Sequence, residues 1–143
     1  MTETVAVAAD HGGYDLKCLL VPELRALGYA PLDLGTDSTA PVDYPDFADA
    51  VAQAVADGRA KLGLLICGSG IGMAMAANRH RAVRAALCHD GLTARLARQH
   101  NDANVLVLGG RILGAEEAKD CLKNFLTAAF EGGRHARRVA KFS

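Results

Sequence analysis

The segment Leu62-Gly63-Leu64-Leu65-Ile66-Cys67-Gly68-Ser69-Gly70-Ile71-Gly72 decides the fold. Its first five residues form an unbroken apolar run, which is typical of a strand covered on both faces. The glycine-rich stretch that follows leads into an alanine- and methionine-rich segment, which predicts a helix over residues 71–77. A buried strand, a tight loop and a helix form the repeating unit of α/β proteins.

Similar patterns flank this segment on both sides. Apolar runs predict further strands over 5–9, 31–34, 82–88 and 104–108, and helical periodicity predicts helices over 14–27, 46–56, 91–98 and 115–130. In the first helix we expect Leu16, Leu19, Leu20 and Leu24 to form the buried face, and Pro22 to bend or restart it. Strands that alternate with helices predict one doubly wound, Rossmann-like domain over 1–143, with a five-stranded parallel sheet flanked by helices. A basic tail over 131–143 completes the chain.

Composition excludes several classes of partner. The 143 residues include 16 Lys plus Arg and 16 Asp plus Glu, so no overall charge attracts nucleic acid or an anionic membrane. The chain begins without a signal-peptide pattern and has no run of about 20 apolar residues, which predicts a cytoplasmic protein. The four cysteines form no C-x-x-C pair, so we expect free thiols, with Cys18, Cys88 and Cys121 as small buried side chains.

Candidate functional residues follow the predicted strands. Asp10 and His11 come after the first strand, Cys67 after the third and Arg111 after the fifth. Ligands of doubly wound sheets bind beyond the carboxyl ends of the strands. We therefore expect these side chains to share one edge of the sheet.

The loop after Cys67 can serve chemistry of two kinds. Its glycines allow backbone N–H groups to approach an anion, and the same surroundings favour a reactive thiolate. A tight turn beside a buried cysteine is the plainer alternative. The glycine spacing differs from the dinucleotide fingerprint, the Walker lysine is absent, and Met73 stands where a cysteine phosphatase needs arginine. The histidines show no metal-ligand spacing, so no metal site is predicted.

Three other groups are ambiguous when each is taken alone. His100 and Asn101 lie in a polar segment predicted as a loop, where histidine can shuttle protons or simply be solvated. Tyr44 can contact a ligand or pack. Arg134 and Arg138 are four residues apart, so a helical tail would place both on one face, where they suit a phosphate dianion. A solvated basic terminus is the alternative.

Taken together, these segments resemble the type B ribose-5-phosphate isomerases and the related galactose-6-phosphate isomerases. The matching pieces span nearly the whole chain in order and are 9–13, 43–45, 66–72, 98–105, 110–111 and 131–135. The resemblance implies an aldose–ketose isomerase of phosphorylated sugars that needs no cofactor. It also implies a homodimer, or a dimer of dimers, with each active site shared between chains.

The resemblance implies specific roles as well. Cys67 is implied as the base that moves a proton between C1 and C2, with Ser69 assisting, and His100 as the acid that opens the sugar ring. Asp10 is implied to act at the ring-oxygen end. The backbone at Gly68, Gly70, Ile71 and Gly72 is implied to hold the enediolate oxygens. The remaining implied contacts are those of the phosphate with His11, Arg111, Arg134 and Arg138, and of the sugar hydroxyls with Asn101 and Tyr44. His100, Asn101 and Arg111 are implied to come from the partner chain.

Two alternatives remain open from the sequence. The substrate could be another sugar phosphate, such as galactose 6-phosphate, allose 6-phosphate or a tetrulose 4-phosphate. A non-catalytic sensor of sugar phosphates would share the glycine loop, although the presence of both Cys67 and His100 argues against it.

Overall fold

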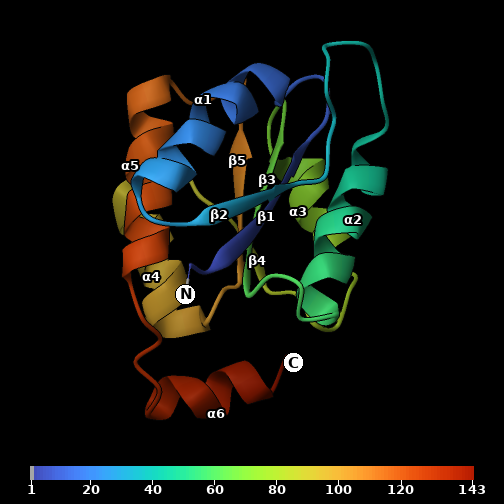
Figure 1. Ribbon diagram of the computed structural model, residues 1–143. Coiled ribbons are helices and arrows are strands. Elements are labelled where there is room, and N and C mark those ends of the chain that lie inside the picture. The colour runs from blue at the N-terminus through green and yellow to red at the C-terminus, as the bar shows by residue number, and fades with distance from the viewer. Residues whose placement is uncertain (1) are drawn as a thin grey trace.

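The sheet organises the molecule. The computed structural model describes residues 2–143, in which five parallel strands form one sheet in the order β2-β1-β3-β5-β4 (Figure 1). The strands are β1 (Thr4–Ala9), β2 (Ala30–Asp33), β3 (Leu62–Cys67), β4 (Ala85–Leu87) and β5 (Val105–Gly109). The predicted α/β class with a five-stranded parallel sheet is confirmed.

Helices cover both faces of this sheet (Figure 1). One layer contains α1 (Tyr14–Ala26), α4 (Gly91–Asn101) and α5 (Ala115–Thr127), and the other contains α2 (Tyr44–Ala56) and α3 (Ile71–Ala77). The short helix α6 (Arg134–Ala140) lies below the sheet in Figure 1, at the edge where the parallel strands begin. Each layer encloses its own apolar core, because side chains of successive strand residues point to opposite faces.

The centre of the sheet is packed most tightly around β3. All six residues of this strand are buried between β1 and β5. At Gly63 a β carbon would lie 2.6 Å from Val51 Cγ1 of α2. The glycine therefore lets α2 approach the strand that ends at Cys67.

Several predicted boundaries were wrong by a few residues. The strand predicted over 82–88 covers only Ala85–Leu87, because side chains of Asn78 and Asn104 bind the backbone beside it. The helix predicted over 46–56 already begins at Tyr44, with Pro45 in its first turn. The helix predicted over 115–130 ends at Thr127.

Helix α1 also differs from its prediction. The helix continues through Pro22 without restarting, because Pro22 and Cys18 are exposed and water can reach the carbonyl that lacks its helical partner. Leu19 and Cys18 face outward, which contradicts the expectation that both are buried. Lys17 is buried in their place, since its Nζ donates to Asp33 Oδ1 and to the Thr36 carbonyl.

Candidate active site

Cys67 ends β3 at the carboxyl edge of the sheet. Only 5% of the residue is exposed, and its Sγ accepts a hydrogen bond of 3.2 Å from the backbone N–H of Gly70. Beyond the strands the backbone stays joined, because the N–H of Gly110 donates to the Cys67 carbonyl (2.8 Å) and that of Arg111 to the Gly68 carbonyl (2.9 Å). The thiol is therefore held by the two central strands of the sheet.

A cavity of about 500 Å³ opens above this thiol. It brings together most of the predicted residues of the carboxyl edge, as the parallel-sheet rule requires. Its lining consists of Asp10, Tyr44, Cys67, Gly68, Ser69, Ile71, Gly72, Met75 and Arg111.

The glycines of the loop leave room for the groups around the cavity. Gly70 adopts a left-handed conformation (φ 81°) directly before α3, which favours glycine. A β carbon at Gly68 would lie 3.1 Å from Arg111 Nη1, and one at Gly72 would collide with the Tyr44 ring. The loop therefore allows Arg111 and Tyr44 to approach the backbone beside Cys67.

Asp10 and His11 lie after β1 on the same edge. Asp10 is buried, and its Oδ1 accepts hydrogen bonds from the backbone N–H groups of Gly12 (2.9 Å) and Gly13 (3.1 Å). His11 Nδ1 accepts from the N–H of Val42 (3.2 Å). This bond places the proton of a neutral His11 ring on Nε2, so that nitrogen can donate to an anion.

The remaining candidates lie at the opposite edge of the sheet. His100 and Asn101 occupy the last turn of α4, directly before β5, so their predicted loop placement was wrong. Arg134 and Arg138 are exposed on α6, near the same edge (Figure 1). The tail is helical as predicted, but one chain does not bring these four side chains to its own Cys67 cavity.

Arg111 also departs from the arrangement that the resemblance implies. It was expected to serve a partner's site, yet its guanidinium lines the Cys67 cavity of its own chain. Asn101 instead lines a separate cavity of about 390 Å³ near Phe142.

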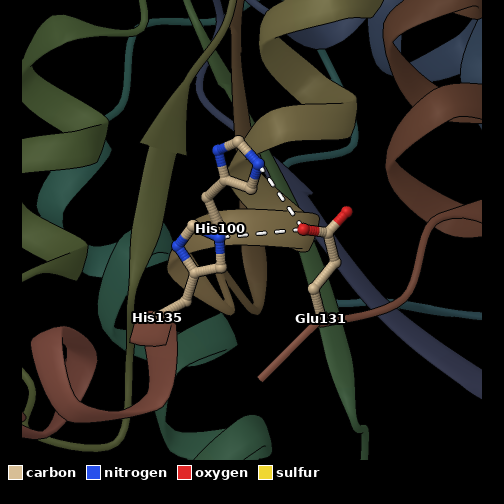
Figure 2. A group of neighbouring side chains, drawn as sticks. All are labelled: His100, Glu131 and His135. Atoms are coloured by element: carbon tan, nitrogen blue, oxygen red, sulfur yellow. Dashed lines mark ion pairs between the residues drawn. The ribbon is translucent and has the colours of Figure 1, made fainter. Parts of the chain in front are cut away.

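His100 belongs to a cluster that sequence reasoning missed. Its ring stacks on that of His135, with centroids 4.3 Å apart and planes at 10°. Glu131 Oε1 lies 3.7 Å from Nε2 of both histidines (Figure 2). The spacing of Glu131 and His135 by four residues was a visible signal, but the stacking on α4 depends on the tertiary fold.

The titration of His135 is perturbed within this cluster. Its pKa is lowered, first by burial and then by the positive charges of Arg134 and, when protonated, His100. Glu131 acts in the opposite direction. The fold therefore opposes protonation of His135.

Two of the other thiols, and a second and larger cavity, are inert by comparison. Burial raises the pKa of Cys88 to about 11 and that of Cys121 to about 12. A larger cavity of about 800 Å³ lies beside α1, but the buried Lys17 at its edge is already paired with Asp33 and Thr36. The chemistry-bearing side chains thus concentrate in the Cys67 cavity and in the His100 cluster.

Comparison with known proteins identifies the family of this chain. A family model described as Ribose/Galactose Isomerase matches residues 5–142. Ribose-5-phosphate isomerase B of Escherichia coli is 45% identical over 135 residues, covering 94% of this chain and 91% of its own. D-Erythrulose-4-phosphate isomerase of Pectobacterium atrosepticum is 41% identical over 140 residues and covers 96% and 91% of the two chains.

A solved structure extends the comparison to three dimensions. The crystal structure of a ribose 5-phosphate isomerase from Thermotoga maritima superposes with a TM-score of 0.96 at 46% identity, covering 99% of this chain and 98% of that one. Within residues 2–143, none of the helices has the length and apolar character needed to span a bilayer. The matched sequence, the shared fold and the cavity at the carboxyl edge lead to one conclusion: this chain belongs to the ribose/galactose isomerase family, a family of sugar phosphate isomerases.

Proposed function

We propose that this isomerase interconverts ribose 5-phosphate and ribulose 5-phosphate through an enediolate, with Cys67 as the base. The observation that carries the proposal is the Cys67 thiol in a cavity that also holds Asp10, Ser69 and Arg111. An aldose–ketose exchange needs a positioned base and donors for the developing oxyanion, and the overall exchange moves protons without net oxidation.

In the proposed reaction the Cys67 thiolate removes the proton from C2 of the open-chain aldose. The C2–H electron pair forms the C1=C2 bond, and the carbonyl electrons move to O1. Backbone N–H groups from Gly68 to Gly72 and the Ser69 hydroxyl stabilise the enediolate oxygens. The thiol then protonates C1 while the O2 proton moves to O1, which leaves the C2 ketone and restores the thiolate.

We further propose that the site is completed by a second copy of the chain. His100, Arg134 and Arg138 lie at the edge opposite Cys67, so one chain does not place them on one substrate. Ile71 and Met75 beside the cavity are 52% and 68% exposed, which suits a face that a partner covers. The partner's His100 would open the ring, while His11, Arg111 and the partner's Arg134 and Arg138 would hold the phosphate.

Mutation of the thiol tests the base assignment. Cys67→Ala should retain the fold by circular dichroism but lower kcat by at least about a hundredfold, the range general-base catalysis contributes. Cys18→Ala is the matched control, because that thiol is exposed and lies on α1. Near-normal turnover of Cys67→Ala would contradict the assignment.

Mixing two inactive variants tests the shared site. Cys67→Ala and His100→Asn chains, refolded together, should form hybrids with one intact site each, which gives about a quarter of wild-type activity for a symmetric dimer. Each variant alone should stay inactive. If the mixture also stays inactive although hybrid dimers form, each site is built from one chain.

The phosphate assignment has its own control on the same helix. Arg134→Ala and Arg138→Ala should raise KM for ribose 5-phosphate, because a guanidinium contact to the dianion is lost. Arg137→Ala removes a neighbouring exposed charge and should leave KM unchanged. Equal effects from all three variants would indicate a general charge effect.

A tetrulose 4-phosphate is the alternative substrate that a specific observation favours, since the Pectobacterium relative is a D-erythrulose-4-phosphate isomerase. The values of kcat/KM should be compared for ribose 5-phosphate, galactose 6-phosphate, allose 6-phosphate and erythrulose 4-phosphate. The highest value identifies the substrate class. A non-catalytic sensor would introduce no deuterium from solvent into any of them.

A further inference from the structure

We propose that Glu131 and His135 are positioning residues for His100. The Glu131 carboxylate lies at the edge of the His100 ring, and the His135 ring covers one face of the His100 ring. This inference rests on the function proposed above. It assigns a role to two residues that lie outside the Cys67 cavity.

Stacking limits how the His100 ring can turn. The rings of His100 and His135 are nearly parallel, at 10°, with centroids 4.3 Å apart (Figure 2). His135 is 6% exposed, so its own ring is fixed by packing. The His100 side chain is 39% exposed, so it keeps access to a substrate while one face is covered.

The connection to α4 is reinforced by the backbone. The N–H of Glu131 donates to the carbonyl of Gln99, in the last turn of α4, at 3.0 Å. The segment that carries Glu131 is thus attached to the residue next to His100. This bond holds the Glu131 backbone beside the end of α4, within side-chain reach of both histidines.

The surroundings of His135 oppose a proton on that ring. Glu131 Oε1 is 3.7 Å from Nε2 of each ring, which suits an ion pair but exceeds a hydrogen bond. Burial first, and then the charges of Arg134 and Arg138 on the same helix, lower the pKa of His135, and its buried Nε2 has no hydrogen-bond partner among residues 2–143. The carboxylate therefore lies beside the more exposed ring, which is the one that a substrate can reach.

The same three side chains have the donor chemistry of a metal site. An imidazole binds a metal ion through a lone pair in the plane of its ring. Two rings stacked at 10° share no point near them that lies in both planes. Their present arrangement therefore favours a positioning role over shared metal coordination.

The test separates ring opening from proton transfer at carbon. Ribose 5-phosphate must open its furanose ring before isomerisation, whereas ribulose 5-phosphate cannot close a five-membered ring on its carbonyl because O5 carries the phosphate. Turnover of ribose 5-phosphate needs His100, and exchange of the C1 protons of ribulose 5-phosphate with deuterated water does not. Both rates are measured on the full-length enzyme by NMR.

Four variants complete the experiment. Glu131→Gln and His135→Ala should lower kcat for ribose 5-phosphate about tenfold, a part of what general acid catalysis contributes, while the exchange rate of ribulose 5-phosphate stays unchanged. His135→Phe keeps a flat ring and should retain most of the activity. Glu116→Gln removes a charge from a fully solvated carboxylate on α5 and is the control.

Three outcomes would overturn the positioning role. Equal loss in both assays would indicate general structural damage, and no loss in either would remove both residues from the reaction. Loss in His135→Phe as great as in His135→Ala would give His135 a proton-transfer role of its own. If the wild-type enzyme neither converts ribose 5-phosphate nor exchanges ribulose 5-phosphate, it is the proposed function that fails.

Discussion

The buried Lys17 offers a sharp test of what holds the carboxyl edge together. The residue is 3% exposed, and its Nζ donates to Asp33 Oδ1 at 2.7 Å and to the Thr36 carbonyl at 2.6 Å. These bonds attach α1 to the end of β2 and to the loop that leads to α2. Lys17→Met removes both bonds and keeps most of the apolar stem.

The expected loss of unfolding free energy in Lys17→Met follows from the surroundings of the two acceptors of the lysine. Asp33 is 46% exposed and can be hydrated, so its ion pair contributes about 0.5–1 kcal/mol. The Thr36 carbonyl belongs to a buried residue, and leaving it without a donor costs about 1–3 kcal/mol. The variant should lose about 1.5–4 kcal/mol of unfolding free energy, which lowers Tm by about 5–13 °C in a domain of this size.

The assay is urea and thermal unfolding, followed by circular dichroism at one fixed protein concentration, because a self-associating chain has concentration-dependent stability. Lys123→Met is the control, since that lysine is exposed on α5. A loss within about 0.5 kcal/mol of the control would refute the reasoning, because it would mean that water replaces both acceptor contacts at no cost.

Further predictions concern titration, thiol reactivity and packing. Because the fold lowers the pKa of His135, the unfolded chain binds a proton at this residue more readily than the folded chain does. The unfolding free energy should therefore fall as the pH is lowered from about 7.5 to about 5.5. In urea unfolding, His135→Phe should weaken this pH dependence. Iodoacetamide at about pH 7.5 should label the exposed Cys18 rapidly but spare Cys88 and Cys121, whose raised pKa values keep them protonated. Mass spectrometry of the labelled peptides measures the extent of labelling at each cysteine. Equal labelling of the three cysteines would contradict the prediction. Gly63→Ala should lose about 1–3 kcal/mol in the same unfolding assay, because its β carbon would lie 2.6 Å from a valine methyl of α2. An unchanged unfolding free energy would show that α2 can move away from β3 without loss of stability.

The sheet and the Cys67 edge were predictable from sequence because both follow from short-range signals. Buried parallel strands are apolar runs, and the parallel arrangement places the residues after them at one edge. Asp10, Cys67 and Arg111 were predicted there for this reason, and all three line the cavity. Burial of Lys17 was not predictable, since its partners Asp33 and Thr36 come from the end of β2 and the loop after it.

The position of His100 could not be derived from sequence, because the end of α4 is set by an unusual residue. Glycine is the common signal for a helix end, yet Asp102 takes the left-handed conformation here (φ 49°). Arg84 and Arg98 pair with its carboxylate at 3.4 and 3.1 Å. The helix therefore continues through His100 and Asn101, and their side chains project from a helix rather than from a loop.

The hydrogen bonds that continue beyond β3 and β5 have a consequence for redesign. The Cys67 and Gly68 carbonyls are both bound to the segment after β5, so the loop cannot widen without disrupting the central strands. The seven-residue helix α6 is too short to be stable alone, and its buried residues His135 and Val139 hold it in place near α4. Libraries that seek to accept longer sugars should therefore leave residues 67–72 unchanged and vary exposed positions of the 128–133 connection and α6 other than Glu131, Arg134 and Arg138.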